Sequence, residues 1–426
     1  MSWRWRAGWK LGFRVFQGAF QGRTKFLLSS ALAMALGLMP LVVVFSIADG
    51  MIEGIMARTL EVAIYHLQVW PFSSLTPPSA LELQNMRQRL DASYPGAHAW
   101  PERDGFALAF TEHARTGVDI RGVDPTWIKD PGVRRYLTAQ KGTLNFPDAH
   151  SIWLGDEIAH KLGVQPGDQI KLLTSQMNNG TPTIPRITTL TVRALVSIGY
   201  QELDKLWVFV PYETAVQLLP GPQTPTYWGV KIPDPYHHLD QATQALGVAA
   251  GNNYIVAPWT QLAKSQLLNY QTTRALLALI TALILLVASV NISTSMVTLV
   301  LERQGEIAIL KATGTPPSII TWQFLSLGML SGLLASIAGI VVGSALALNI
   351  NNFIGGIDNV VSFFQGNGKS FHLLNNNYYL TTIPVRLHTS VLLLMGVGTV
   401  FLATFAAWFP ARRASRLRPL EVLRKV

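Results

Sequence analysis

Three charged side chains stand close together in a short segment between two long apolar runs of the chain. Glu302, Arg303 and Glu306 fall within an arc of roughly 100° if the segment is helical, because residues three and four apart are neighbours on a helix. Side chains grouped in this way can pair with one another or bind a charged partner. No known catalytic motif accompanies them in the sequence.

The motifs of common enzymes are missing from the rest of the sequence. It contains no H-E-x-x-H zinc motif, no G-x-S-x-G nucleophile elbow and no cysteine. His237 and His238 are adjacent, so on a helix they do not face each other. The segment GNGKS at 366–370 resembles the end of a phosphate-binding loop, but Phe363 occupies the position of the required glycine. We therefore predict no catalytic residues, no metal site and no cofactor bound by this chain.

The composition is that of a membrane protein with an added soluble domain. Of the 426 residues, 49% are hydrophobic and 14% are charged, whereas soluble domains carry about 25% charged residues. Four apolar runs, near 26–48, 275–297, 319–348 and 390–409, reach the length of about 20 residues that a membrane-spanning helix needs. No small-residue cleavage site follows the first run, so we interpret it as a retained anchor and not as a signal peptide.

The distribution of charge predicts the orientation of these spans. Residues 1–25 carry six Lys/Arg and no acid, and residues 410–426 carry six Lys/Arg and one acid, whereas the segment 49–274 holds 18 basic and 20 acidic residues. The net charge of +10 therefore flanks membrane spans, as the positive-inside rule describes, and does not form a nucleic-acid-binding face. Both termini are expected in the cytoplasm and the segment 49–274 outside.

The predicted fold is a membrane protein with four transmembrane α-helices and a large extracytoplasmic α+β domain between the first two. The β-branched and aromatic runs of the large segment alternate with helical patterns, which favours a sheet covered by helices. The expected parts are a cytoplasmic or interfacial amphipathic helix over 1–25, spans over 26–48, 273–300, 319–348 and 390–409, the outer domain over 49–272, a cytoplasmic coupling segment over 301–318, an outer loop over 349–389 and a basic tail over 410–426.

Two helical features bear on assembly. The second span is expected to continue as one helix from 274 to 312, ending at Gly314, with Pro316 and Pro317 starting the next helix. Its polar residues, such as Asn291, are expected to form hydrogen bonds between helices or back to the carbonyl four residues earlier, with substrate contact as the alternative. The third span has glycines four residues apart, which predicts a close packing face within the chain or toward a second subunit; these are Gly328, Gly332, Gly339 and Gly343.

A hairpin with a protruding tip is predicted at 175–185. Asn179-Gly180 provides the positive φ angle of a tight turn, and Pro182 and Pro185 stop the arms from continuing as paired strands. The tip is either a handle for a partner or simply a long hairpin.

Two motifs give a resemblance to a family. "ER-x-x-EIAILKA-x-G" from Glu302 and "PARRA-x-R-x-x-P-x-E-x-LR" from Pro410 resemble the FtsX-like permeases of the type VII ABC transporters, which carry a MacB-like periplasmic core. The segments "VDIRGVDP" and "IWLGDEIAHKLGVQPGDQIKLL" are similar to those of LolC- and LolE-type permeases, which release lipoproteins. Glu302-Arg303 itself is more typical of the macrolide-exporter branch.

The resemblance implies a set of partners and contacts. Such permeases pair with a second permease subunit and bind a cytoplasmic ATPase dimer, which carries ATP and Mg²⁺. They lift triacylated lipoproteins from the outer leaflet of the bacterial inner membrane and pass them to a periplasmic carrier. The ATPase-coupling residues would be Glu302, Arg303, Glu306, Lys311 and Gly314. The lipoprotein acyl chains would contact Leu38, Met39, Val42, Val43, Ile47, Leu276, Leu279, Ile280 and Leu283. The carrier-binding hairpin would use Met177, Asn178, Asn179, Gly180, Pro182 and Pro185.

Two alternatives remain open from the sequence. One is a MacB-like exporter whose outer domains transmit movement without admitting lipid between the spans. The other is an FtsX-like regulator that activates a cell-wall hydrolase outside the cell. Whether the chain forms a homodimer or a heterodimer, and whether it takes the LolC-like or the LolE-like role, also stays open.

Overall fold

The computed structural model describes residues 9–14, 25–72, 78–174, 177–178, 181–182, 185–220, 224, 226–365 and 383–416. The chain divides into two compact units. We call the first the membrane unit; it comprises Met1–Ile52, Tyr270–Leu373 and Ile383–Val426. The second, the sheet unit, comprises Glu53–Asn269 and Leu374–Thr382. The predicted amphipathic helix over 1–25 falls mainly outside the described residues, although 9–14 are helical.

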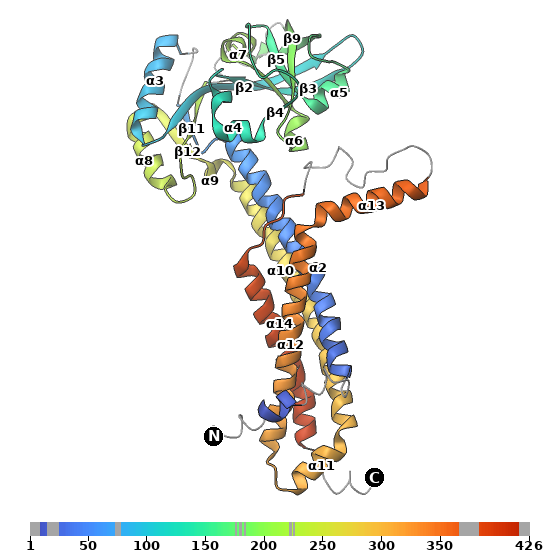
Figure 1. Cartoon of the computed structure of the whole chain (residues 1–426). Helices are drawn as coiled ribbons and strands as arrows, with labels where there is room; N and C mark the ends of the chain where they lie inside the picture. The colour runs from blue at the N-terminus through green and yellow to red at the C-terminus, as the bar shows by residue number, and fades with distance from the viewer. Residues whose placement is uncertain are drawn as a thin grey trace. The chain divides into compact units, whose positions relative to one another are not determined.

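Long apolar helices form the membrane unit (Figure 1). They are α2 (Lys25–Arg58), α10 (Lys264–Glu302), α12 (Pro317–Leu348) and α14 (Thr389–Ser415). Within the described residues, four segments are long and apolar enough to cross a membrane: Leu28–Ile64, Lys264–Glu302, Pro317–Leu348 and Thr389–Ser415. The four predicted spans are thus present, and the helices extend beyond the apolar runs that predicted them.

The glycines of α12 allow close approach on two sides. A Cβ atom added to Gly328 or Gly332 would lie 2.4 and 2.6 Å from the Cβ atoms of Ala407 and Ala403 on α14. One added to Gly339 or Gly343 would lie about as close to α2, at 3.0 and 2.9 Å from its nearest atoms. The predicted packing face is confirmed within the chain, because only residues without a side chain fit at these contacts.

The helix predicted over 274–312 is wrong as a single element. Helix α10 ends at Glu302, and α11 (Gln304–Ala312) begins after Arg303, whose φ of −103° and ψ of 20° depart from helical values. Gly314 has a φ of +88°, and its N–H bonds to the carbonyl of Lys311 while that of Thr315 bonds to Leu310. This pair of bonds is the Schellman ending of a helix. Pro317 then starts α12 as predicted.

The segment predicted as an outer loop over 349–389 begins with a helix. Its first residues form helix α13 (Ile350–Gln365). The stretch after it, including GNGKS at 366–370, lies outside the described residues. Residues 383–388 lead into α14 and lie against α2, because the N–H of Arg386 donates to the carbonyl of Ser46 at 3.0 Å.

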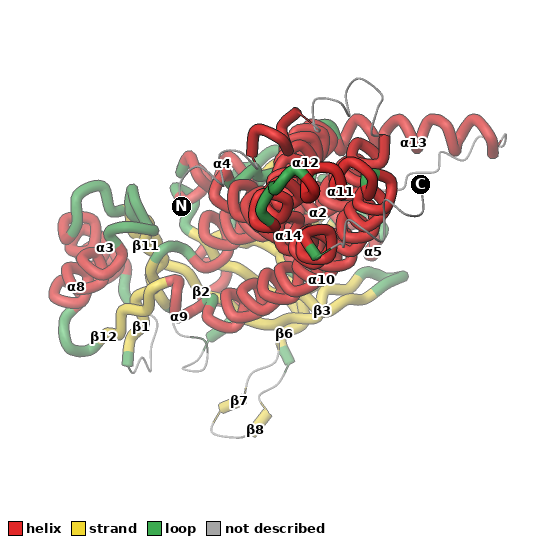
Figure 2. Tube along the Cα trace, turned by 90° about the horizontal axis from the view of Figure 1, so that it is seen from below, coloured by secondary structure: helices red, strands yellow, loops and turns green. Residues whose placement is uncertain are grey.

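A mixed ten-stranded sheet forms the core of the sheet unit, together with a separate two-stranded hairpin (Figures 1 and 2). The sheet order is β12-β1-β11-β2-β3-β10-β5-β9-β4, with β6 paired to β2 and β9. The strands are β1 (Leu67–Pro71), β2 (His98–Phe110), β3 (Arg115–Val123), β4 (Thr138–Gly142), β5 (Ser151–Gly155), β6 (Gln169–Thr174), β9 (Arg186–Ser197), β10 (Trp207–Pro211), β11 (Tyr227–Lys231) and β12 (Tyr254–Pro258).

Helices cover this sheet, which confirms the α+β prediction. They are α3 (Ala80–Ser93), α4 (Pro131–Tyr136), α5 (Asp156–Leu162), α6 (Gln201–Asp204), α7 (Tyr212–Leu218), α8 (Leu239–Ala250) and α9 (Trp259–Leu262), with the short 3₁₀-helix η2 (Trp127–Lys129). One apolar core packs α5 and α7 against the central strands, with Ile158 and Ala215 among its buried members. Another is aromatic and contains Trp127, Trp153 and Phe209.

Candidate functional site

The predicted coupling segment is a short helix with one buried and one exposed face. Ile307 and Ala308 of α11 are both buried, and Ile307 belongs to the apolar core of the membrane unit. Glu306 lies on the free side with 65% of its side chain exposed, and its carboxylate accepts from Arg303 at 2.7 Å. Glu302 is exposed as well. The arrangement fixes the helix on the bundle and presents its charges outward, as a docking surface requires.

Lys311 is placed differently from the other predicted coupling residues. Its Nζ atom donates to the carbonyl oxygen of Ser415, the last residue of α14, at 2.9 Å. A cation at this position interacts favourably with the free carbonyl groups at a helix C-terminus. Lys311 therefore ties α11 to the end of α14. Gly314 provides the turn that follows α11 and has no side chain with which to bind a partner.

The residues predicted to contact acyl chains fall into two groups. Leu276, Leu279, Ile280 and Leu283 of α10 are all about half exposed, and Met39, Val43 and Ile47 of α2 are partly exposed. Leu38 and Val42, in contrast, are fully buried. Because these two side chains pack against Gly339 and Gly343 of α12, they are part of the bundle core and are not accessible to a lipid in this conformation.

A second apolar surface lies on the other side of α10. A cavity of about 420 Å³ opens between α2, α10 and α14, with Phe45, Leu285 and Met395 among its lining residues. At its edge Arg274 donates to the carboxylate of Asp49 at 2.7 Å. This ion pair joins the first span to the second.

The predicted carrier-binding hairpin is described only in part. Strands β7 (Met177–Asn178) and β8 (Thr181–Pro182) pair antiparallel. Asn179 and Gly180 lie outside the described residues. Pro185 directly precedes β9 and is exposed.

A cluster of charges that the sequence reasoning missed holds the end of the first span within the sheet unit. After Arg58 the helix continues as the π-helix η1 (Thr59–Ile64). Lys231 of β11 donates to Glu61 at 2.8 Å and to Asp130 at 2.5 Å, and it is only 5% exposed. Arg58 donates to the carbonyl of Ile198 at 3.1 Å. These contacts from three separate parts of the sheet unit clamp the helix end.

A second buried group adds to this clamp. Arg121 donates to the carbonyl of Val62 at 2.6 Å and to Glu102 at 2.5 Å. Burial raises the pKa of Glu102 to about 8, although the charge of Arg121 opposes the rise and that of Asp104 favours it. Tyr227 donates to Asp104 at 2.6 Å. The sequence carried one signal for this buried group. The segment "HAWPERDGFALAF" contains charged residues between apolar ones, and charged residues inside a buried strand require polar partners.

The clamp includes a residue in an unusual backbone conformation. Tyr65, between η1 and β1, has a φ of +60° and a ψ of 179°, a region that non-glycine residues rarely adopt. Its side chain is buried, and a Cβ atom at Gly229 would lie 2.3 Å from its ring. Gly229 therefore leaves space for the ring of Tyr65 at the junction between η1 and β1. The buried ring in turn holds the backbone of this junction in place.

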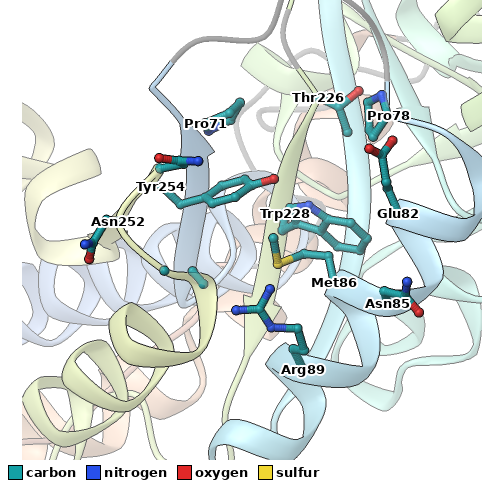
Figure 3. Close-up of a pocket in the computed structure, with 13 residues that line it drawn as sticks. Pro71, Pro78, Glu82, Asn85, Met86, Arg89, Thr226, Trp228, Asn252 and Tyr254 are labelled. Carbon is teal, nitrogen blue, oxygen red and sulfur yellow. The ribbon is translucent and has the colours of Figure 1, made fainter.

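A further cavity of about 890 Å³ lies beside α3, where β11, β12 and the loop before β12 meet it. Figure 3 shows Trp228 with Met86 near it, and Arg89 reaching toward that loop. There Arg89 donates to the carbonyl of Ala249. Among the described residues no group of histidines and carboxylates could hold a metal ion. The lining of the cavity is mixed, with Glu82, Asn85 and Arg89 beside Met86 and Trp228.

Family comparisons cover nearly the whole chain. The model of the FtsX-like permease C-terminal region matches residues 278–419, and that of the MacB-like periplasmic core domain matches residues 27–248. The lipoprotein-releasing system transmembrane protein LolC of Xylella fastidiosa is 27% identical over 410 residues, which are 93% of each chain. LolE of Haemophilus influenzae is 27% identical over 407 residues, covering 92% of this chain and 93% of LolE. The periplasmic region of MacB from Actinobacillus actinomycetemcomitans aligns with 47% of this chain and 91% of its own at 13% identity, with a TM-score of 0.30.

Proposed function

This chain belongs to the FtsX-like permeases with a MacB-like periplasmic core domain, and from that premise we propose that it is a permease subunit of a lipoprotein-releasing system. The observation that carries the proposal is the similarity to proteins named as LolC and LolE, which covers 93% and 92% of this chain. A match to the family models alone would be shared by exporters and regulators, whereas these relatives span both the membrane helices and the outer domain.

In this proposal the chain works in the bacterial inner membrane with both termini in the cytoplasm and the sheet unit in the periplasm. It does not hydrolyse ATP itself. A cytoplasmic ATPase dimer binds α11, with Glu306 and Glu302 as the accessible charges. The buried contacts of Ile307 support this role, because a force applied to α11 by the ATPase then acts on the apolar core of the membrane unit.

The outer part of the proposal concerns client and carrier. Half-exposed leucines and isoleucine on α10 provide a surface for the acyl chains of a triacylated lipoprotein, and the hairpin β7–β8 binds a periplasmic carrier. The charged clamp around η1 supports a coupled movement of helix and sheet, since the last turn of the first span is held there by several buried contacts. A second permease subunit completes the transporter.

Copurification with the cognate ATPase tests the proposed assembly. We expect the full chain, expressed with that ATPase, to be isolated as a complex whose ATP hydrolysis responds to a triacylated lipoprotein. A complex that responds to a soluble cell-wall hydrolase and not to lipoprotein would favour the FtsX-like alternative. Absence of any complex with the ATPase would contradict the proposal.

A further inference from the structure

Helix α13 follows the third span directly and changes direction. The span α12 ends at Leu348, and α13 begins at Ile350 after the single residue Asn349. In Figure 1 α13 runs away from the bundle across the direction of α12, and Figure 2, which looks along the bundle, shows α13 extended sideways. Both views agree, and α12 and α13 belong to the same compact unit. A helix of this kind runs beside a membrane surface if its start lies at that surface.

Contacts near the start of α13 place it at the level of the membrane surface. The side chain of Asn351 donates to the carbonyl of Ile383 and accepts from its N–H, both at 3.1 Å. Three residues further on, Arg386 bonds to Ser46 of α2, and the ion pair of Asp49 with Arg274 follows on the same helix. Ion pairs and the ends of apolar spans mark the boundary between hydrocarbon and water. Helix α13 therefore begins at the outer boundary of the spans.

The sequence of α13 places its apolar side chains, with the exception of Phe363, on one face of the helix. Ile350, Phe353, Ile354 and Ile357 recur at the spacing of one helical face, and the sequence continues this spacing with Val360, Val361 and Phe364. Asn352, Gly355 and Asn359 fall on the opposite face. On the apolar face Phe353 is 57% and Ile357 37% exposed, while Ile350 and Ile354 are half-buried.

We propose that α13 lies in the headgroup layer of the outer leaflet, with its apolar face turned to the acyl chains of the phospholipids. Its continuity with a membrane span, its direction and its open apolar face all fit a lipid surface. Segment 350–365 contains one acidic residue and no lysine or arginine. Insertion must then rest on apolar burial and not on attraction to anionic headgroups, so it should be insensitive to salt.

The absence of cysteine from the chain allows a direct test with single-cysteine variants. Phe353→Cys and Ile357→Cys report on the apolar face, and Asn352→Cys and Gly355→Cys are the matched controls on the polar face. A Cβ atom at Gly355 meets no other atom within 4 Å, so this control causes no steric clash. Each full-length variant is labelled with a fluorophore in detergent, placed in nanodiscs, and compared with and without brominated phospholipid.

We expect bromine to quench the labels at 353 and 357 and to leave those at 352 and 355 bright, at low and at high salt alike. Two apolar-face positions keep the test valid if one variant fails to fold. Equal quenching of both faces, or none at either, would overturn the proposal. So would loss of quenching in high salt. Labels at 353 and 357 that are shielded from an aqueous quencher but not reached by bromine would show a protein cover, which also overturns it.

Discussion

Lys231 is the residue on which the clamp around η1 depends most. It lies almost fully buried between Glu61 and Asp130, so it neutralises two carboxylates that otherwise face each other. Lys231→Met removes the ammonium group shared by these carboxylates, and breaking a buried ion pair on one side typically destabilises by about 3–5 kcal/mol. We expect a loss of this order in the unfolding free energy of the sheet unit, measured by denaturant titration of the full chain in detergent.

The control for this variant is Lys129→Met, which removes an exposed lysine from the neighbouring segment. It should change the unfolding free energy little, because exposed charges contribute little to stability. Equal effects of the two variants would show that the contacts of Lys231 do not hold the helix end.

Glu102 makes the stability of the sheet unit depend on pH. Its folded pKa of about 8 lies above the ordinary glutamate pKa of about 4.3, so the folded state favours the proton. The stability contributed by proton binding to Glu102 is fully present below the pKa of this residue in the unfolded state. It is lost as the pH rises through the pKa of Glu102 in the folded state. The free energy of unfolding should therefore fall between about pH 4.3 and 8. Glu102→Gln should flatten this dependence in unfolding curves at pH 5 and 8, and an unchanged slope would assign it to other groups.

At the scale of single elements, α11 is the part that most directly tests the coupling role. Glu306→Lys reverses the most exposed charge of this helix and leaves Ile307 and Ala308 in place. We expect lower ATPase activity of the assembled complex, because a charged contact with the motor would become repulsive. The loss should be severalfold or more, since disrupting a buried charged contact at an interface typically costs about 2–5 kcal/mol.

The matched control is Glu112→Lys, which makes the same change at an exposed position between β2 and β3. Complexes with this variant should keep the original activity. If Glu306→Lys hydrolyses ATP like the control, the docking role of α11 is refuted.

The packing of α12 on α14 gives a prediction that does not depend on any partner. Gly332→Leu places a side chain where a single Cβ atom already lies 2.6 Å from Ala403, whereas Gly398→Leu on α14 enters open space. Overpacking typically destabilises by about 1–3 kcal/mol. Thermal unfolding of the purified chain should show a lower midpoint for Gly332→Leu only. Equal midpoints would mean that the helices separate easily at this contact.

Particular elements show what the sequence could and could not predict. The spans and their glycine contacts followed from apolar length and four-residue spacing, and Gly314 ended its helix because only a residue without Cβ takes a positive φ easily. The break at Arg303 was missed because Gly305 is the one strongly helix-weakening residue in "VLERQGEIAIL", and a single glycine is tolerated inside a helix. Strand β2 was missed because Pro101 and the charges after it are unusual in a central strand, and they are tolerated here because Glu102 pairs with Arg121.

The candidate sites show the same difference between local patterns, which the sequence reveals, and contacts between distant residues, which it does not. Charged residues of α11 were found from helical spacing, which is a local property. The burial of Leu38 and Val42 could not be predicted from the sequence. All faces of a membrane span are apolar, so the sequence does not show which face packs on a neighbouring helix and which faces lipid. The clamp of Lys231, Glu61 and Asp130 joins residues far apart in the sequence, and a single sequence carries no signal for such pairs.

At the scale of the whole molecule, two units share one chain that passes between them more than once. The first span enters the sheet unit through η1, and the second leaves it through α10, which continues as far as Glu302 beside α11. Each unit has its own core. We propose that this chain connects two partners. The cytoplasmic ATPase acts on α11, and the lipid-anchored client binds outside.

Release of a lipoprotein tests this account most directly. The full chain, its second permease subunit where one exists and the cognate ATPase are reconstituted in lipid with a triacylated client and a soluble carrier. We expect ATP to move the client into the soluble fraction in a complex with the carrier, and an ATPase variant without hydrolysis to leave it in the membrane. If the ATPase turns over and the client stays in the membrane, the proposed function is contradicted.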